Sequence, residues 1–375
     1  MPRSPDEQPR HVALFLPTLG GGGAERVMLI LAQGFIQRGM KVDLLVSRAV
    51  GSYVDEVPSG VRMIDLGARR VISSLPRLVR YLRSERPAVL LATMSHANVT
   101  ALVARRLART STRVVVREAN TPSVSARSGG VTNRVMPALV RLCYPGADGI
   151  VAVSEGVAED LKKVTGLPRS RIEVLANPII TADLAGQAAE PLDDPWFTPG
   201  APPVILGVGA LRKQKDFPTL IRAFRELRSR REARLLILGE GTERLGLESL
   251  VQELGVAADV RLHGWVPNPY TYMAKAAVFV LSSAWEGMPG VLIQALACGA
   301  KVVATDCESG PREVLAAGEY GQLVPTVNPK ALAAAIAITL DGPRRPVPDA
   351  VLAPYTQDGA VDRYLRALRM AASHV

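Results

Sequence analysis

One stretch in the second half of the chain constrains its fold more than any other. Residues 278–283 (VFVLSS) are an apolar run that predicts a buried strand, and residues 301–306 (KVVATD) predict a second strand. Between them lie a loop with two glycines, Pro289 at a position where a helix can begin, and the amphipathic segment VLIQALA. A strand–loop–helix–strand unit of this kind indicates a parallel sheet, which binds ligands at the carboxyl edge of its strands.

The loop between the first strand and the helix has the composition of a binding site. Glu286 is its one charged residue, and Gly287 and Gly290 allow a ligand to approach the backbone closely. The helix directs its free N–H groups and the positive end of its dipole at the loop, and Gln294 lies about one turn into the helix. Such a loop suits a diphosphate on backbone amides and a sugar ring on side chains. An ordinary turn with a solvated glutamate is the alternative.

Residues 286–299 (EGMPGVLIQALACG) and 302–315 (VVATDCESGPREVL) carry a family resemblance. They resemble the donor site of the retaining, nucleotide-sugar-dependent glycosyltransferases of group 1 type with the GT-B fold, in particular the branch that builds bacterial lipopolysaccharide, capsule and other surface glycans. The family motif is Glu, seven residues, Glu. Here the second position is Gln294, which can still accept and donate hydrogen bonds to the ribose hydroxyls met at that position. The resemblance implies donor contacts at Gly287, Met288, Pro289, Gly290, Val291 and Gln294.

Length and composition indicate two globular domains and exclude several classes of protein. A chain of 375 residues with 48% hydrophobic content can build two cores. No apolar run reaches the roughly 18 residues that span a bilayer, and the first ten residues are too polar for a secretory signal. The three cysteines and four histidines show no disulfide or metal-ligand spacing, which predicts a reducing cytoplasm and no metal site.

Two series of alternating strands and helices predict an α/β fold of two Rossmann-like, doubly wound domains. The first series begins at residues 11–19 (HVALFLPTL) and the second at residues 204–210 (VILGVGA). Residues 181–203 are rich in proline and lack periodicity, which predicts a linker. The GT-B resemblance implies two domains that face a cleft. Residues 1–180, with a returning helix at 357–375, are expected to bind the acceptor, and residues 204–356 the donor.

Four consecutive glycines, Gly20 to Gly23, follow the first predicted strand. Their spacing differs from G-x-G-x-x-G, so the dinucleotide-binding motif is absent. Backbone amides in such a loop can approach an anion, although a flexible tight turn also explains the glycines. The family places a GG-A-E loop here, which implies that Gly22 and Gly23 contact the donor.

The segment GVGALRKQKDF (residues 207–217) is a second motif. Lys215 lies just before a predicted helix and Arg212 is close to it, and cations at such a loop suit a leaving diphosphate. A solvent-facing basic turn is the alternative. Relatives have arginine where this chain has Ala210, so Arg212 is expected to replace that cation. The resemblance also implies donor contacts at Gly209, at Gly241 in LILGEGTE, and at Val266 in RLHGWVP, the last through its backbone near the base.

Two loops in the first half carry candidate acceptor residues. Asn98, in SHAN, follows one predicted strand, and Glu118 and Asn120, in REAN, follow the next. Both loops are expected at the carboxyl edge of the sheet, where polar groups can meet an acceptor. Many relatives have a histidine at the second loop, and this chain does not. Helix capping by Asn98 and a local ion pair of Glu118 are the structural alternatives.

The positive charge is concentrated in one region. Residues 62–141 contain fifteen arginines, no lysine and three acidic residues, whereas the whole chain has a net charge of +10. A basic surface suits anionic lipid or nucleic acid, but the low aromatic content of 5% argues against nucleic acid. An Arg-rich solvated surface is the alternative. The predicted helix with Arg77, Arg80 and Arg83, which alternate with Leu78, Val79 and Leu82, is the expected contact with an anionic membrane.

These observations lead to one main hypothesis. The chain is expected to be a retaining glycosyltransferase that moves a hexose or N-acetylhexosamine from a nucleotide diphosphate sugar, most simply UDP-linked, to a glycan or polyprenyl-linked acceptor. Glu286, Lys215 and Arg212 are the expected catalytic residues, and no metal or prosthetic group is required. The expected location is cytoplasmic, at the inner face of the plasma membrane. A nucleotide-sugar epimerase on the same scaffold and a basic membrane- or nucleic-acid-binding protein are the alternatives.

Overall fold

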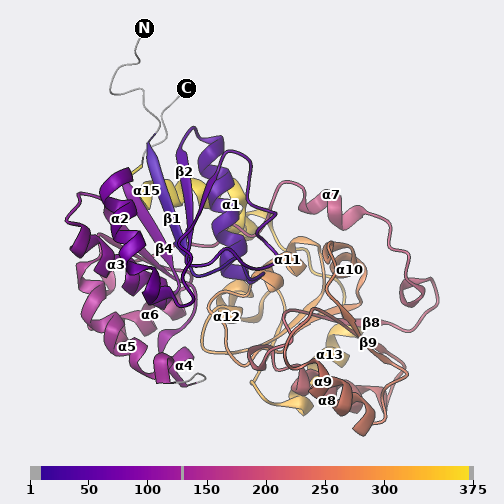
Figure 1. Cartoon of the computed structure of the whole chain (residues 1–375). Coiled ribbons are helices and arrows are strands. Elements are labelled where there is room, and N and C mark those ends of the chain that lie inside the picture. The colour runs from indigo at the N-terminus through magenta and orange to yellow at the C-terminus, as the bar shows by residue number, and fades with distance from the viewer. Residues whose placement is uncertain (1–9, 128–130, 371–375) are drawn as a thin grey trace. The chain divides into compact units, whose positions relative to one another are not determined.

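The computed structural model describes residues 10–127 and 131–370, and the chain divides into two compact units (Figure 1). Unit 1 comprises residues 1–178 and 354–375, and unit 2 comprises residues 179–353. Each unit contains one parallel sheet flanked by helices, of seven strands in unit 1 and six in unit 2. The prediction of two Rossmann-like α/β units is therefore confirmed. In the described ranges, no helix combines the length and the hydrophobicity needed to cross a bilayer.

The sheet of unit 1 has the order β3-β2-β1-β4-β5-β6-β7. Its strands are β1 (His11–Leu16), β2 (Lys41–Val46), β3 (Arg62–Asp65), β4 (Val89–Thr93), β5 (Arg113–Glu118), β6 (Gly149–Ala152) and β7 (Ile172–Val174). The direction of winding reverses between β1 and β4, and a doubly wound sheet binds ligands at the carboxyl ends of its strands near such a reversal. Apolar residues of β1 and β4, among them Leu14 and Leu91, are fully buried because helices cover both faces.

The helices of unit 1 follow the apolar periodicity of the sequence. They are α1 (Gly23–Gln37), α2 (Leu75–Glu85), α3 (Ser95–Ala108), α4 (Pro122–Arg127), α5 (Val131–Cys143), α6 (Glu155–Thr165) and α15 (Gln357–Ala367). The Ser154 side chain accepts a hydrogen bond from the amide of Val157 and begins α6, and Gly166 ends it in the left-handed conformation. The helix α15 packs on α1 where Gly34 has no side chain, since a Cβ there would lie 2.4 Å from Val361.

The sheet of unit 2 has the order β10-β9-β8-β11-β12-β13. Its strands are β8 (Val204–Val208), β9 (Arg234–Leu238), β10 (Val260–Gly264), β11 (Val278–Leu281), β12 (Val302–Thr305) and β13 (Gln322–Val324). Its helices are α7 (Leu184–Ala189), α8 (Phe217–Arg228), α9 (Arg244–Glu253), α10 (Tyr270–Lys275), α11 (Gly290–Ala297), α12 (Pro311–Val314), α13 (Pro329–Asp341) and α14 (Asp349–Leu352). The winding reverses between β8 and β11, so the loops after these two strands lie at the switch point.

The segment expected as a linker, residues 181–203, is fastened to unit 2. It contains α7 and a short helical turn at Pro195–Phe197. The Trp196 ring lies 4.3 Å from the guanidinium of Arg261 and 5.1 Å from that of Arg234, and Asp194 accepts a hydrogen bond from Arg261 at 2.5 Å. These contacts join residues about 40 to 70 positions apart along the chain, as the residue numbers show, so local periodicity carries no signal for them.

Candidate active site

The two strongest motifs of the sequence meet at one ion pair in unit 2. Lys215 follows β8 in a short helical turn at Lys213–Lys215, and Glu286 follows β11 in the loop that precedes α11. The Lys215 Nζ lies 2.6 Å from Glu286 Oε1, and the Glu286 side chain is only 6% exposed. Two predicted catalytic residues, 71 positions apart, are thus in direct contact. A desolvated pair of this kind keeps both side chains in a defined geometry at the carboxyl edge of the sheet.

Residues that the sequence had not indicated complete this arrangement. Ser283 donates a hydrogen bond to Glu286 Oε1 at 2.7 Å, and Gln214 donates to Glu286 Oε2 at 3.4 Å. The two loops are also joined through their backbones, because the Ala284 amide donates to the Gln214 carbonyl at 2.8 Å. The motif GVGALRKQK contains Gln214, and the strand VFVLSS ends in Ser283. Neither residue type stands out in such a loop, and only the fold shows that both reach the carboxylate.

The loop that carries Glu286 is supported by the segment ESGP. Ser309 donates a hydrogen bond to the Gly287 carbonyl at 2.9 Å. Gly310 has φ 94°, and a Cβ there would lie 2.4 Å from Pro289 Cδ, so only glycine fits. Pro289 occupies the N-cap of α11 without a side-chain cap, so the first backbone amides of α11 are directed at the loop as expected. The predicted donor residues Met288, Gly290 and Val291 lie in this loop and first turn.

Other predicted donor residues also lie at the carboxyl edge of unit 2. A Cβ at Gly209 would lie 3.1 Å from Lys215 Cε, so this glycine leaves room for the lysine side chain. A Cβ at Gly241 would lie 2.3 Å from the Leu211 carbonyl oxygen, so Gly241 allows the loops after β8 and β9 to touch. Val266 is half-buried in the loop after β10, beside the 66% exposed Trp265. Gln294 donates a hydrogen bond to the Tyr270 hydroxyl at 3.3 Å.

Arg212 has a different environment from Lys215. Its side chain is exposed and lines a pocket of about 190 Å³ together with Lys213, Phe217 and Glu243. This pocket lies beside the start of α8, where Asp216 caps the helix by accepting from the Thr219 amide. The two cations of the motif therefore differ: Lys215 is held against Glu286, and Arg212 is available to an anion at the surface.

In unit 1 the predicted glycine loop leads into α1. Gly22 is the N-cap of this helix and Gly23 its first residue. The Glu25 carboxylate packs against Gly22, since a Cβ at that glycine would lie 2.5 Å from Glu25 Oε2. Glycine at this position thus leaves space for a buried carboxylate in the first turn of the helix.

A second pocket, of about 200 Å³, lies at the carboxyl ends of β4 and β5 in unit 1. Two of the three predicted acceptor residues, Glu118 and Asn120, line it, and so does His96. Asn98 is fully buried, and its amide donates to the Arg117 carbonyl and to the Tyr144 hydroxyl, both at 2.9 Å. The structure therefore brings Glu118 and Asn120 together at the pocket and places Asn98 in the supporting framework.

Glu118 has an unusual electrostatic environment. It is buried and accepts hydrogen bonds from Tyr144 at 2.6 Å and Ser95 at 3.0 Å. Burial raises the pKa of Glu118 to about 7, although the hydrogen bonds from Tyr144 and Ser95 oppose the increase. Burial also lowers the pKa of His96 from its ordinary value, because it disfavours the charged imidazolium at the pocket.

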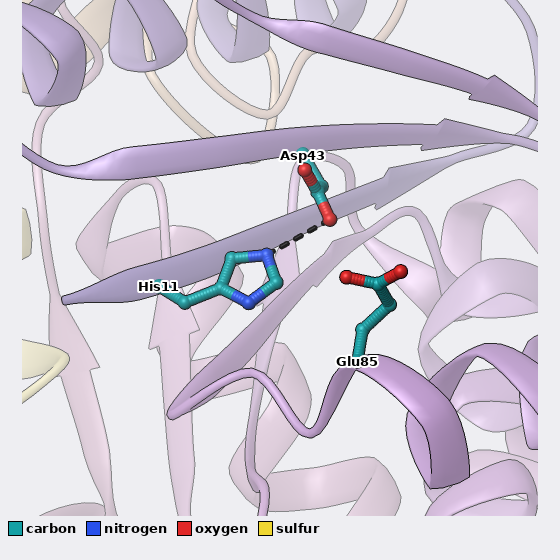
Figure 2. A group of neighbouring side chains, drawn as sticks. All are labelled: His11, Asp43 and Glu85. Carbon is teal, nitrogen blue, oxygen red and sulfur yellow. Dashed lines mark hydrogen bonds and ion pairs between the residues drawn. The ribbon is translucent and has the colours of Figure 1, made fainter. Parts of the chain in front are cut away.

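The residues His11, Asp43 and Glu85 form a group whose ligand atoms lie within 4.8 Å of one another (Figure 2). Asp43 is fully buried and accepts from His11 at 2.8 Å, from Tyr81 at 2.6 Å and from both sides of the Arg62 guanidinium. Arg62 also pairs with Glu85 at 2.7 Å, so a cation already occupies the group.

This network lies near the amino ends of β1, β2 and β3, at the edge opposite to the ligand-binding edge of the sheet. Burial raises the pKa of Asp43, but the hydrogen bonds from His11, Arg62 and Tyr81 outweigh burial and hold this pKa well below its ordinary value. We interpret the group as a structural ion-pair network that fixes the three strands.

Comparison with known proteins identifies the family. The family model "Glycosyl transferases group 1" matches residues 190–348, and "Glycosyltransferase Family 4" matches residues 21–183. A Campylobacter jejuni protein named N-acetylgalactosamine-N,N'-diacetylbacillosaminyl-diphospho-undecaprenol 4-alpha-N-acetylgalactosaminyltransferase is 33% identical over 334 residues, which is 85% of this chain and 87% of that protein. The lipopolysaccharide core biosynthesis glycosyltransferase LpsE of Rhizobium meliloti is 34% identical over 52% of this chain and 55% of its own length.

Solved structures confirm the architecture. Anabaena Alr3699/HepE in complex with UDP-glucose matches with a TM-score of 0.75 and 16% identity, covering 95% of each chain. The lipopolysaccharide outer core galactosyltransferase WaaB matches with a TM-score of 0.72 and 18% identity, covering 96% of this chain and 98% of that one. The chain thus has the GT-B fold and belongs to the group 1 glycosyltransferases.

Proposed function

We propose that this glycosyltransferase transfers a hexose or N-acetylhexosamine from a UDP-linked donor to a lipid-linked glycan, with retention of anomeric configuration. The observation that carries the proposal is the buried contact between Lys215 and Glu286, at the loop where the motif predicted a sugar diphosphate. Solved neighbours bind UDP and UDP-glucose, which supports a uridine nucleotide. The donor lies on unit 2, and the acceptor lies at the Glu118 and Asn120 pocket of unit 1.

The chemistry requires stabilisation of a leaving diphosphate. When the bond between the sugar carbon and the diphosphate oxygen breaks, negative charge develops on the leaving group, and the acceptor oxygen forms the new glycosidic bond. Lys215, Arg212 and the first amides of α11 supply preorganised positive charge for this step. These groups make a metal ion unnecessary in the proposed mechanism. The proton of the acceptor hydroxyl passes to the departing diphosphate.

Glu286 holds the donor sugar in this scheme. Its carboxylate is fixed by Ser283 and Gln214 as well as by Lys215. A sugar hydroxyl that donates to this carboxylate is held at a defined distance from the lysine. The same residues therefore orient the ring and neutralise the leaving group.

The acceptor is proposed from the Campylobacter jejuni relative, which is 33% identical over 85% of this chain. Its name specifies transfer to a sugar on diphospho-undecaprenol. We infer for this chain an acceptor of the same chemical class, a sugar carried by a polyprenyl diphosphate, which places the reaction at the inner face of the plasma membrane. The glycan of such an acceptor lies at the lipid surface.

The surface that meets the lipid is proposed on α5 instead of α2. On α2, Leu78 and Leu82 are buried in the core and Val79 is half-buried, so most of the apolar face that was expected beside the three arginines is not available. Of these arginines, Arg77 and Arg83 also donate hydrogen bonds to backbone carbonyls.

The helix α5 has the opposite character. Val135, Leu139 and Leu142 are 48%, 37% and 77% exposed, at positions that share one helical face. Arg134 and Arg141 are exposed on the same helix. An apolar stripe flanked by cations suits an anionic lipid surface, where each nearby cation contributes about 1 kcal/mol.

The proposal is tested by transfer assays on a synthetic polyprenyl diphosphate sugar. A panel of UDP-sugars is first screened by thermal shift, because a ligand of the native state raises the melting temperature. We expect UDP to be released only when the acceptor is present. The product should have the anomeric configuration of the donor, as measured by NMR from the one-bond carbon–proton coupling constant at the anomeric carbon. Conversion of the nucleotide sugar without an acceptor indicates an epimerase instead. A product with the opposite anomeric configuration contradicts the proposed retention and leaves the rest of the proposal in place.

A further inference from the structure

Gln294 stands where the family has glutamate, and the structure shows a neighbour whose side chain contacts it. The Gln294 Nε2 donates to the Tyr270 hydroxyl at 3.3 Å. Tyr270 is the first residue of α10, which packs against α11. We propose that Tyr270 is a positioning residue for the donor: it holds the Gln294 side chain in place so that the amide meets the ribose hydroxyls of the nucleotide. This inference rests on the proposed function.

The need for such a residue follows from the chemistry of the amide. A glutamate presents two equivalent acceptor oxygens, so either orientation of the carboxylate can receive a hydrogen bond from a hydroxyl. A glutamine of the same shape presents one acceptor and one donor, and rotation by 180° exchanges them. The Tyr270 hydroxyl can both accept and donate, so it holds the amide in either orientation. The contact therefore fixes where the amide lies, and less conformational freedom is lost when the ribose hydroxyls bind.

The backbone that carries Tyr270 is itself held in place by contacts within unit 2. The Tyr270 amide donates to Asn268 Oδ1 at 3.0 Å. The Asn268 amide donates in turn to the Gln187 carbonyl at 2.9 Å and to Glu190 Oε2 at 2.8 Å. The helix α10 also packs against α7. The segment around α7 therefore acts on the donor site through Asn268, Tyr270 and Gln294, and the amide is held in place before the nucleotide arrives.

Substitution of one atom tests the role of Tyr270. Tyr270→Phe keeps the ring and removes the hydroxyl. We expect the Kd of UDP, measured by isothermal titration calorimetry, to rise about 3- to 10-fold, as for the loss of one hydrogen bond. The KM for the donor should rise by the same factor, with kcat little changed. The matched control is Tyr272→Phe on the same helix, whose ring contacts with Phe197 and His263 need no hydroxyl.

A second background separates positioning from a merely structural role. A Gln294→Ala variant has no amide for Tyr270 to hold, so adding Tyr270→Phe should leave the UDP affinity at that of Gln294→Ala alone. If Tyr270→Phe costs the same affinity in the wild type and in the Gln294→Ala variant, this inference is overturned, as it is by wild-type affinity in Tyr270→Phe. Absence of UDP binding by the wild type would overturn the proposed function and this inference with it.

Discussion

At the scale of single residues, the contact between Glu286 and Lys215 gives both side chains two tasks. In the free protein each neutralises the other in a site that is nearly closed to water. When the donor binds, the carboxylate takes a sugar hydroxyl and the ammonium takes the diphosphate. We therefore expect Glu286→Ala to abolish transfer while far-UV circular dichroism shows an intact fold. Glu286→Gln, which keeps the shape of the side chain and removes its charge, should also be severely impaired.

The control for this prediction is Glu319→Ala, which removes an exposed carboxylate elsewhere in unit 2. Transfer by this variant should match that of the wild type. Wild-type turnover by Glu286→Ala would remove Glu286 from the mechanism.

The two cations of the same motif should differ in their contribution. Lys215 is enclosed with Glu286, whereas Arg212 is exposed at the rim of a neighbouring pocket. A preorganised donor in a closed site contributes more to a developing charge than an exposed one. We expect Lys215→Ala to lower kcat/KM by an amount equivalent to about 2–4 kcal/mol of lost transition-state stabilisation. Arg212→Ala should lower kcat/KM by less. Equal and small effects of the two substitutions would contradict the leaving-group role of Lys215.

The pKa of Glu118 predicts a pH dependence of stability in unit 1. Burial raises this pKa from 4.5 to about 7, so between these values the folded protein binds a proton that the unfolded chain releases. The resulting stability is fully present below pH 4.5 and is lost as the pH rises through 7. The Glu118→Gln side chain cannot ionise. Between pH 5 and pH 8 the free energy of unfolding should therefore fall less for this variant than for the wild type, and the two falls should differ by at most about 3 kcal/mol. Parallel pH profiles of the two proteins would show that Glu118 does not titrate in this range.

Sequence patterns identified some site residues and misjudged others for a physical reason. Glu286 and Lys215 were predicted because each combines a charge with a glycine-containing loop at a strand end. Asn98 was predicted because it is polar and follows a strand, yet it lies in the first turn of α3 and its amide is turned inward to Arg117 and Tyr144. Position in a loop follows from periodicity, but the direction of a side chain depends on partners that lie far away in the sequence. The hydrogen bond between Tyr270 and Gln294 belongs to this second kind.

At the scale of elements, α5 and α2 can be compared directly as membrane contacts. The triple substitution Val135→Ser, Leu139→Ser and Leu142→Ser removes the exposed apolar stripe and leaves the buried Met136 and Val140 in place. We expect co-sedimentation with phosphatidylglycerol vesicles to weaken at least about tenfold, given the apolar area removed, and wild-type binding to fall as salt rises.

Two variants serve as controls for the membrane experiment. The pair Leu245→Ser and Ile338→Ser removes apolar side chains that are 78% and 62% exposed in unit 2, and should leave binding unchanged. Arg80→Ser removes an exposed arginine of α2. If Arg80→Ser weakens sedimentation and the triple substitution on α5 does not, α2 is the contact after all.

The strands of both sheets and most of their covering helices could be predicted from the sequence. Runs such as VFVLSS and KVVATD are apolar because parallel strands are buried on both faces. No helix was predicted for the segment that forms α4 and α5. The stripe on α5 is exposed, so its hydrophobic residues do not mark a core-facing side. The helix α7 is held by Asn268 and the turn after it by the Trp196 contacts, none of which is local.

At the scale of the whole molecule, the end of the chain returns to unit 1 and closes its core. Tyr364 of α15 is fully buried and its hydroxyl accepts from Arg117 Nε at 2.9 Å. Arg117 is also buried, and it donates to Thr93 and Asn177 as well. A buried guanidinium needs its partners, since an unpaired buried charge is costly. The stability of unit 1 should therefore depend on residues more than two hundred positions away from its central strands, whereas unit 2 should not.

Tyr364→Ala tests this dependence, because it opens a cavity and removes one partner of Arg117. We expect the free energy of unfolding of unit 1 to fall by about 3–5 kcal/mol, and Tyr364→Phe, which removes only the hydroxyl, to cost about 1–3 kcal/mol. The three tryptophans, Trp196, Trp265 and Trp285, all lie in unit 2, so their fluorescence reports on that unit alone. In urea, the circular dichroism of Tyr364→Ala should show an early transition that the tryptophan fluorescence lacks, and the affinity for UDP should stay that of the wild type. An equal shift of both signals would mean that the two units unfold as one, and no shift in either would mean that α15 is dispensable for unit 1.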